Sequence, residues 1–200
     1  MKSSPRPAEP AVQASYMKNL FATLASLGKL AEVEEADPDL IQEIEAAPRL
    51  SWLPVSLNVR TVEAMAARFG EQRGIELLAE CVYRQFDTPL WKSFVGGAMR
   101  LLGTEPSLLG RFLPEALQLV FRDCGRWAVD NTDDTELTVS VRGLPAALAA
   151  HGPWLRSLAT GMTPLFTLCG CAGTACLAEV DAATGSARYV LSWKAAPADG

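Results

Sequence analysis

The chain has 200 residues and a mass of 21.5 kDa, of which 49% are hydrophobic and 20% are charged. This composition is that of one folded domain, and it excludes disordered and fibrous proteins and small scaffolds that depend on disulfides or metals. Eighteen basic against 23 acidic residues give a net charge of −5. No segment collects Lys and Arg into a stripe, so the sequence argues against a nucleic-acid partner.

The two ends of the sequence differ in character from its middle. Residues 1–14 contain Pro5, Pro7 and Pro10 and lack the apolar run of a secretory signal, so we expect a disordered lead-in. A single domain is expected over residues 15–195. No window of 18 residues is uninterruptedly apolar, which argues against a membrane span and favours a cytoplasmic protein. The five cysteines are then expected to be reduced thiols.

Apolar residues recur at three- and four-residue steps through most of the first 121 residues, a spacing typical of amphipathic helices. Pro114 interrupts the clearest apolar stripe and predicts a kink or a split, because a proline ring presses on the carbonyl four residues back. We expect that stripe to be deeply buried. The predicted helices cover residues 15–27, 38–47, 56–69, 75–86, 89–102 and 108–121.

After Phe121 the apolar period changes from 3.6 to 2. Residues 125–130 and 135–142 predict two antiparallel strands, and in the second strand apolar and polar residues alternate. The intervening turn, residues 131–134, holds two neighbouring aspartates. We interpret these as turn residues that bond their own backbone, in preference to an acid catalyst.

A helical region follows from Leu144 to Gly170, with breaks expected at Gly152-Pro153 and at Pro164. Residues 176–181 and 187–194 then predict a second hairpin. The fold class is therefore α+β: an N-terminal helical bundle followed by a ββαββ antiparallel sheet with helices packed on one face.

The sequence lacks the motifs of the common enzyme classes. It has no Gly-rich phosphate loop, no Rossmann fingerprint, no G-x-S-x-G elbow and no H-E-x-x-H pair. Its one histidine, His151, precedes Gly152-Pro153, a helix-end position where histidine commonly caps the last carbonyls. We therefore favour a structural role for His151 over a catalytic or ligating one.

Three cysteines, Cys169, Cys171 and Cys176, form the one chemical cluster in the sequence. A tetrahedral zinc site would need a fourth ligand from Cys81, Cys124 or His151, and the paired C-x-x-C spacing is absent. No base or cationic cluster beside Cys171 would lower its pKa. We therefore interpret the three cysteines as small, partly buried residues at a tight junction between a helix and a strand. The alternative is a small thiol- or metal-dependent enzyme that uses this cluster.

Aromatic residues suggest where an apolar ligand would bind. Trp127, Tyr189 and Trp193 lie on predicted strands, beneath the predicted helix that runs from Trp154 to Cys169. Core packing is the simpler interpretation, but a ligand slot would form between this sheet face and that helix. The pocket candidates are Trp127, Trp154, Met162, Cys169, Tyr189 and Trp193.

Seven carboxylates crowd the segment from Glu32 to Glu45. We interpret them mainly as a solvated helix face. The alternative is a structural adaptor that docks a basic partner through Glu34, Glu35 and Asp37, with salt-sensitive binding.

The order of elements and several scattered residues carry a family resemblance. The marks are Trp52-Leu53-Pro54, Gly125, Arg142-Gly143-Leu144-Pro145, Gly170 and residues 189–193, Tyr-Val-Leu-Ser-Trp. From Tyr16 to Trp193 the chain resembles a myxobacterial paralogous family, similar in layout to the vinyl-four-reductase, TRAPP-subunit and haem nitric-oxide-binding superfamily. The resemblance implies a helix-plus-antiparallel-sheet domain, often dimeric, that binds a small hydrophobic or tetrapyrrole-like ligand or a protein partner.

The cysteine-rich stretch of vinyl-four-reductase domains and the Tyr-x-Ser-x-Arg motif of the haem-binding branch are not reproduced, so no cofactor, metal or catalytic residue is carried over. The resulting hypothesis is a non-enzymatic ligand-sensing or protein-interaction module in bacterial signalling or regulation. Its expected partners are a small hydrophobic ligand, or a protein partner or second copy of the chain.

Overall fold

The computed structural model describes residues 9–194, apart from the side chains of Pro89, Leu90, Phe94 and Leu102. Helices occupy most of the first 120 residues and return between the two strand pairs. Their bounds are α1 Ala14–Ser26, α2 Leu30–Ala36, α3 Pro38–Ala46, α4 Ser56–Phe69, α5 Glu71–Gln85, α6 Pro89–Leu102, α7 Pro106–Leu109, a 3-10 turn Gly110–Phe112, α8 Leu113–Val120, α9 Ala146–Ala149, α10 Gly152–Met162 and α11 Pro164–Leu168.

The strands form two antiparallel sheets with the orders β2-β1-β3 and β4-β5-β7-β6. Their bounds are β1 Ala11–Gln13, β2 Trp52–Pro54, β3 Phe121–Arg122, β4 Arg126–Thr132, β5 Glu136–Arg142, β6 Gly173–Asp181 and β7 Ser186–Trp193. The predicted α+β fold class is confirmed, including the two hairpins and the helices between them.

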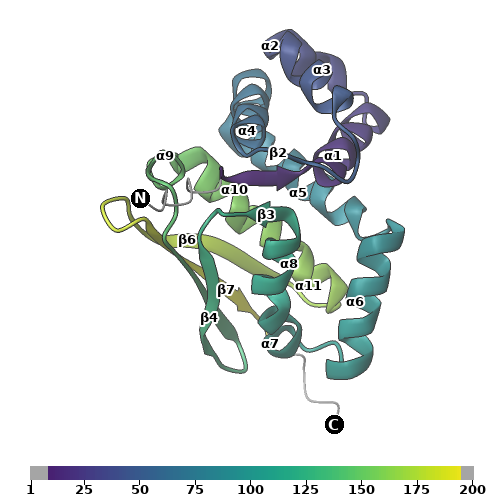
Figure 1. The fold of residues 1–200 in the computed structure, drawn as a ribbon. Coiled ribbons are helices and arrows are strands. Elements are labelled where there is room, and N and C mark those ends of the chain that lie inside the picture. The colour runs from purple at the N-terminus through teal and green to yellow at the C-terminus, as the bar shows by residue number, and fades with distance from the viewer. Residues whose placement is uncertain (1–8, 195–200) are drawn as a thin grey trace, which may run out of the picture.

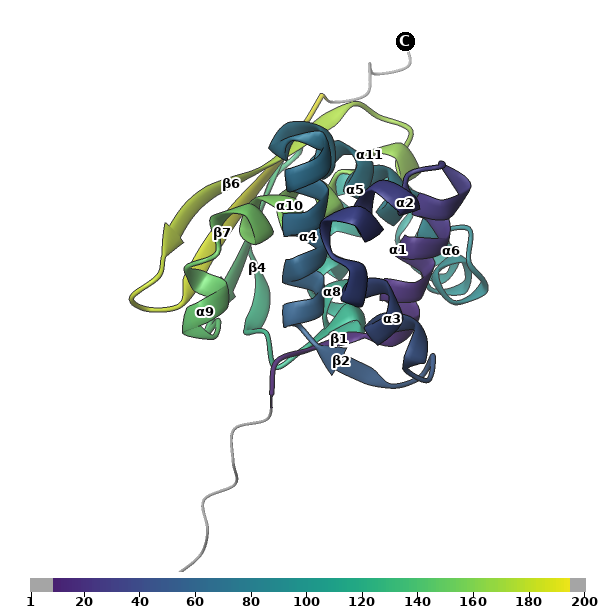
Figure 2. The same cartoon turned by 90° about the horizontal axis from the view of Figure 1, so that it is seen from above.

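The helices cover one face of the four-stranded sheet (Figure 1). Seen from above, this sheet lies on one side, α4 and α10 run through the middle, and α1, α2 and α3 lie on the far side (Figure 2). Along β7 the side chains of Tyr189 and Leu191 are fully buried, whereas Arg188, which precedes them, is exposed. The alternation that predicted the strand thus separates a core face from a solvent face.

In the turn between β4 and β5, an aspartate bonds its own backbone, as the sequence predicted. The carboxylate of Asp133 accepts hydrogen bonds from the backbone N–H groups of Thr135 (2.8 Å) and Glu136 (2.7 Å). These bonds favour the ionised carboxylate and lower the pKa of Asp133. Asp133 therefore acts as a turn residue, and its carboxylate is occupied by the backbone.

Regular secondary structure occurs within a segment that the sequence suggested was disordered. Residues 1–14 were expected to be a disordered lead-in, but Ala11–Gln13 form β1 and Val12 is fully buried. Residues 1–8 and residue 195 lie outside the described residues. β1 pairs with β2 on one side and β3 on the other. A three-residue strand after a proline is too short to give a periodic signal, which explains the error.

Two helical details differ from expectation and one is confirmed. α2 was not predicted, because its seven residues bury only Val33 and show no apolar stripe. The split at Pro114 is confirmed: α7 and a 3-10 turn precede α8, which has Pro114 in its first turn. The apolar stripe of residues 108–121 is not deeply buried throughout. Several of its members, including Leu113 and Leu117, are only half-buried.

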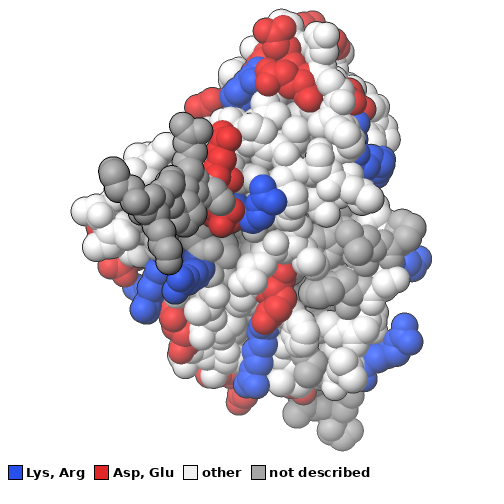
Figure 3. Space-filling model, viewed as in Figure 1, with Lys and Arg blue, Asp and Glu red and all other residues white. Residues whose placement is uncertain are grey.

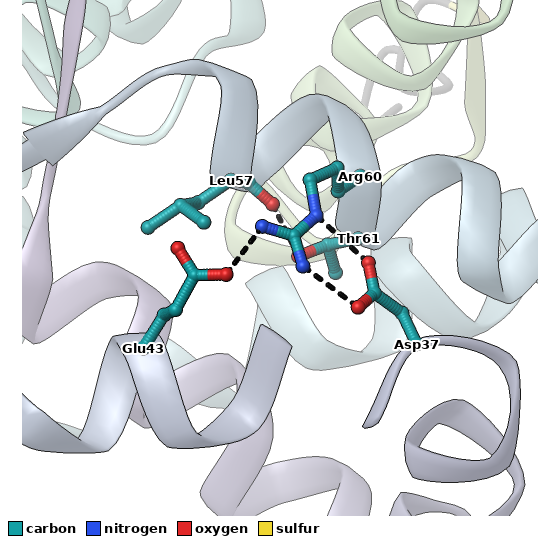
Figure 4. A network of polar contacts seen from close by, with 5 residues as sticks. All are labelled: Asp37, Glu43, Leu57, Arg60 and Thr61. Atoms are coloured by element: carbon teal, nitrogen blue, oxygen red, sulfur yellow. Dashed lines mark hydrogen bonds and ion pairs between the residues drawn. The ribbon is translucent and has the colours of Figure 1, made fainter. Parts of the chain in front are cut away.

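The acidic segment is tied to α4 by ion pairs. The guanidinium of Arg60 donates to both carboxylate oxygens of Asp37 (2.8 and 2.7 Å) and to Glu43 (2.6 Å), so it joins the ends of α2 and α3 to α4 (Figure 4). Glu35 pairs with Arg68 at 2.7 Å. Acidic side chains gather at the end of the molecule formed by α2 and α3, next to basic ones (Figure 3). Their own chain thus supplies counter-charges to Glu35 and Asp37.

Within residues 9–194, each helix falls short of the length and apolar character needed to cross a bilayer.

Candidate ligand-binding cavity

A cavity of about 90 Å³ lies among α5, the start of α6, α8 and α10. Figure 1 shows α8 in front of α10 and α11, with α6 to one side. Its walls are mainly apolar, and side chains from α1, α4 and β3 also contribute to them. The lining residues are Tyr16, Asn58, Leu78, Val82, Gln85, Phe86, Trp91, Leu113, Ala116, Leu117, Val120, Phe121, Ser157, Leu158, Gly161 and Met162.

A second cavity of about 60 Å³ adjoins the first along α8 and α10. The two share wall residues from α6, α8 and α10 and from the loop before α6. The shared residues are Phe86, Trp91, Leu113, Ala116, Gly161 and Met162. Together the two cavities form one apolar slot, which we call the central cavity.

The central cavity exists because small residues stand where larger ones would fill it. A Cβ built on Gly161 of α10 would have no neighbouring atom within 4 Å, and Ala116 of α8 also contributes to the wall. Leu113 and Leu117 line the same space and remain half-buried. The most regular apolar stripe in the sequence is therefore incompletely covered because it borders this space.

One polar side chain in the wall has no partner. Gln85 is 2% exposed, and neither its amide nitrogen nor its amide oxygen has a hydrogen-bond partner. Burying an amide without compensation costs about 1–3 kcal/mol in proteins. Such a group needs an explanation, and in a cavity wall a bound molecule can supply the partner.

Two other polar side chains in the wall, Asn58 and Ser157, already bond within the protein. Asn58 accepts a hydrogen bond from the indole N–H of Trp154 (2.8 Å) through Oδ1, and the hydroxyl of Ser157 donates to the carbonyl of Trp154 (2.7 Å). Tyr16 also lines the wall, and burial raises the pKa of its hydroxyl so that it stays neutral. No charged side chain is among the described residues of the wall. The cavity therefore favours an uncharged occupant.

The six pocket candidates from the sequence are separated by the structure. Met162 lines both parts of the central cavity, and Trp154 is buried directly behind it, bonded to Asn58. Trp127 and Tyr189 pack together under the sheet with ring centroids 5.8 Å apart. Trp193 packs on Phe166 at 6.2 Å, and Cys169 is half-buried against the core.

The pair under the sheet also carries unpaired polar atoms. Neither the indole nitrogen of Trp127 nor the hydroxyl of Tyr189 has a hydrogen-bond partner. Both belong to the buried hydrophobic core, and neither contributes to the wall of the central cavity. Their large apolar area accounts for their burial.

His151 begins a helix and does not end one. Its Nδ1 accepts the backbone N–H of Trp154 (3.0 Å), which makes it the N-cap of α10, and its Nε2 lies 2.9 Å from Glu63 on α4. The expectation that it caps the last carbonyls of a helix was wrong, because α9 ends at Ala149 and Pro153 belongs to the first turn of α10. Its ring joins two helices at the surface.

The cysteine cluster shows no reactive geometry. Burial raises the pKa of Cys169 to about 12 and also raises the pKa of Cys171, so both stay protonated thiols near neutral pH. Cys176 is exposed on β6. Among residues 9–194, no three His, Cys, Asp or Glu side chains are grouped so that they could hold a metal ion.

The fold has counterparts among solved structures. The Fe(II) unliganded H-NOX protein from K. algicida superposes with a TM-score of 0.59 at 11% identity, covering 92% of this chain and 97% of that one. A mutant of T. Tengcongensis H-NOX gives a TM-score of 0.60 at 12% identity, covering 93% and 99%. No family model and no curated protein matches the sequence. The chain therefore has an H-NOX-like fold. This is the haem nitric-oxide-binding fold, one of the three folds to which the sequence layout was compared.

A haem does not fit the residues present in the central cavity. Haem iron in proteins is held by His, Cys, Met or Tyr, and the one histidine of the chain is a surface N-cap. Only Tyr16 and Met162 in the described wall offer a ligand of these types. Cavities for drug-sized molecules have about 300–1,000 Å³. The central cavity is far smaller, and its described wall has no Lys or Arg for carboxylate groups.

The nearest counterpart of the haem-branch motif also faces elsewhere. Thr138, Ser140 and Arg142 on β5 have the spacing of the Tyr-x-Ser-x-Arg motif, with Thr in place of Tyr. They alternate with Val139 and its fully buried neighbours on the core face, so they belong to the opposite, helix-free face of the sheet. They do not line the central cavity.

The sequence interpretation missed Gln85, although a signal for it was present. Gln85 follows Leu78 by seven residues and Val82 by three, so it lies on the same helical face as both. A polar residue inside an apolar stripe must either reach solvent or find a partner. That exception to the periodic pattern was the clue to the cavity.

Proposed function

We propose that this chain is a non-enzymatic ligand-sensing module that holds a small uncharged molecule in the central cavity. The observation that carries the proposal is an apolar slot between helices with one unpaired amide in its wall. Small-molecule sites in proteins have this character, mostly apolar with a few polar groups that fix orientation. The H-NOX-like fold supports it further, because the similar solved structures include an Fe(II) H-NOX protein and a structure that probes heme distortion in the H-NOX family.

The side chains around the cavity favour binding over chemistry. Its described wall has no carboxylate, histidine or thiol that could act as an acid, base or nucleophile. A role in bacterial signalling, a cytoplasmic location and kinship with the myxobacterial family belong to the same proposal and rest on the sequence. Met162 is the one pocket candidate from the sequence that contributes to the proposed site.

Toluene is a suitable first probe for this proposal, because the cavity is apolar and small. An engineered apolar cavity of about 150 Å³ binds benzene. We expect saturable toluene binding by isothermal titration calorimetry. The variant Gly161→Leu should weaken it at least tenfold, because the new side chain would project into space that is empty in the wild type.

Gly97→Leu is the matched control for that variant. Gly97 is also a helical glycine whose added Cβ would have no neighbour within 4 Å, but it does not line the central cavity. Gly97→Leu should bind toluene as the wild type does. The proposal fails if wild-type protein does not bind toluene, or if Gly161→Leu binds it equally well.

A further inference from the structure

We propose that the natural ligand of the central cavity is a small, uncharged molecule that carries a primary amide or lactam group, and that this group pairs with the side chain of Gln85. The inference rests on the proposed function, since it requires the cavity to be a ligand site. It goes further by assigning the chemical class of the ligand and the residue that recognises it.

Gln85 is held at the cavity wall by its backbone. It is the last residue of α5, and its carbonyl oxygen accepts hydrogen bonds from the backbone N–H of Thr88 (2.9 Å) and from the hydroxyl of Thr88 (2.6 Å). The side chain therefore starts from a fixed point, and its amide is buried without a partner. Asn58 and Ser157 in the same wall are already bonded to Trp154.

The chemistry of an amide side chain defines its complement. Gln85 has an acceptor oxygen and a donor NH₂ side by side; both are unpaired and closed off in this conformation, so the side chain must turn toward the cavity to meet a ligand. A ligand group with one donor and one acceptor in the same plane, as in an amide or lactam, satisfies both at once. Either orientation of the Gln85 amide gives this result, so the inference does not depend on which of its two atoms is nitrogen.

Charge and size restrict the ligand further. An ionised carboxylate would be buried without a cation, because the described wall contains neither Lys nor Arg. Volumes of about 90 and 60 Å³ leave room for one ring with a short substituent. A ring-bearing amide is therefore preferred over its carboxylate and over larger molecules.

Three probes of nearly equal size separate these possibilities: benzamide, toluene and benzoate. Their dissociation constants are measured by calorimetry at neutral pH for the wild type and for Gln85→Leu. We expect Gln85→Leu to reduce the affinity for benzamide relative to toluene at least tenfold, which corresponds to about two neutral hydrogen bonds. Benzoate should bind at least tenfold more weakly than benzamide to the wild type.

Two further variants serve as controls. Gln72→Leu changes a glutamine of the same helix that is exposed and bonded to Glu76, so it should leave the affinity ratio unchanged. Gln85→Met keeps an unbranched side chain of similar length and should lower the ratio as Gln85→Leu does. Toluene binding by either Gln85 variant reports that its cavity is intact.

The outcomes distinguish the two proposals. If toluene binds and the ratio of benzamide to toluene affinity is the same in wild type and both Gln85 variants, the amide assignment is overturned while the ligand-binding function stands. Preferential binding of benzoate also overturns it. If neither toluene nor benzamide binds to the wild type, the proposed function itself is wrong.

Discussion

Two apolar regions of the molecule are built from similar residues but differ in how completely side chains fill them. One lies under the four-stranded sheet, and the other lies among α5, α6, α8 and α10. Under the sheet, Leu137, Val139 and Leu191 are fully buried. Around the central cavity, Leu113 and Leu117 remain half-buried. The amount of apolar surface in the sequence is thus a poor guide to how completely it is packed.

Glycines show the same contrast. A Cβ on Gly110 would lie 2.5 Å from Cδ2 of Leu137, so a larger residue in the 3-10 turn would force this fully buried side chain to shift. Gly161 has no atom near the position of its missing Cβ. The first glycine closes a packed core and the second leaves a space open. A glycine in a helical segment therefore has no single structural meaning until its neighbours are known.

Truncation of a leucine in each region should give the largest difference. Leu137→Ala should lower the free energy of unfolding by about 2–5 kcal/mol, because it leaves a cavity in packed surroundings. Leu117→Ala should cost about 1 kcal/mol, since the side chain is half-buried and borders space already. Urea unfolding followed by circular dichroism measures both values. Equal losses would mean that the two regions are packed alike.

Adding one methyl group tests the glycines in the opposite direction. Gly110→Ala should destabilise the protein by about 1–3 kcal/mol through overpacking against Leu137. Gly161→Ala should stabilise it by about 1 kcal/mol, because alanine is the better helix former and its Cβ meets no atom. Thermal unfolding of the two variants decides the matter. A stabilising Gly110→Ala would contradict the close approach described here.

The unpaired amide provides a third test of the cavity wall. Gln85→Leu should raise the free energy of unfolding of the ligand-free protein by about 1–2 kcal/mol, because a buried amide without partners is replaced by an apolar group. Gln72→Leu, at an exposed position of the same helix, should change it by less than about 0.5 kcal/mol. If Gln85→Leu were destabilising, the amide of Gln85 would have partners in solution.

The smallest effect is expected at the ion-paired surface. The bonds from Arg60 hold the pKa of Asp37 below its usual value. The ionised carboxylate therefore stabilises the fold fully at pH values above the unfolded pKa of about 4. This contribution is lost as the pH falls through the lowered pKa of the folded state. Asp37→Asn should remove up to about 1 kcal/mol at pH 7 and less at pH 2. Glu34→Gln, which has no ion pair in the described residues, is the control. Chemical unfolding across this pH range measures the difference.

Much of the fold could be predicted from the sequence because its signals are local. The change of period after Phe121 marks the change from helices to strands, and Pro114 divides the last helix of the bundle as expected. β1 could not be predicted, because a three-residue strand is defined by partners about 40 and 110 residues away. α2 was missed because it buries a single apolar residue.

The candidate site was harder to predict than the fold. Aromatic residues drew attention to the sheet face, where Trp127 and Tyr189 pack against each other. Sequence periodicity identifies which side of a helix is apolar, but it does not reveal whether that side meets a neighbour or a space. The polar Gln85 within an apolar stripe was a local signal of the cavity that the sequence interpretation did not use.

The pairing of β1 has a consequence for how the chain is made. Ala11 pairs with Pro54 on one side and with Arg122 on the other, so the central strand of this small sheet acquires its second partner only after about 110 more residues have been synthesised. At translation rates of about 5–20 residues per second, that delay lasts several seconds or more. The edge of β1 therefore stays open on the ribosome during this interval, and a chaperone that binds extended segments would have time to occupy it.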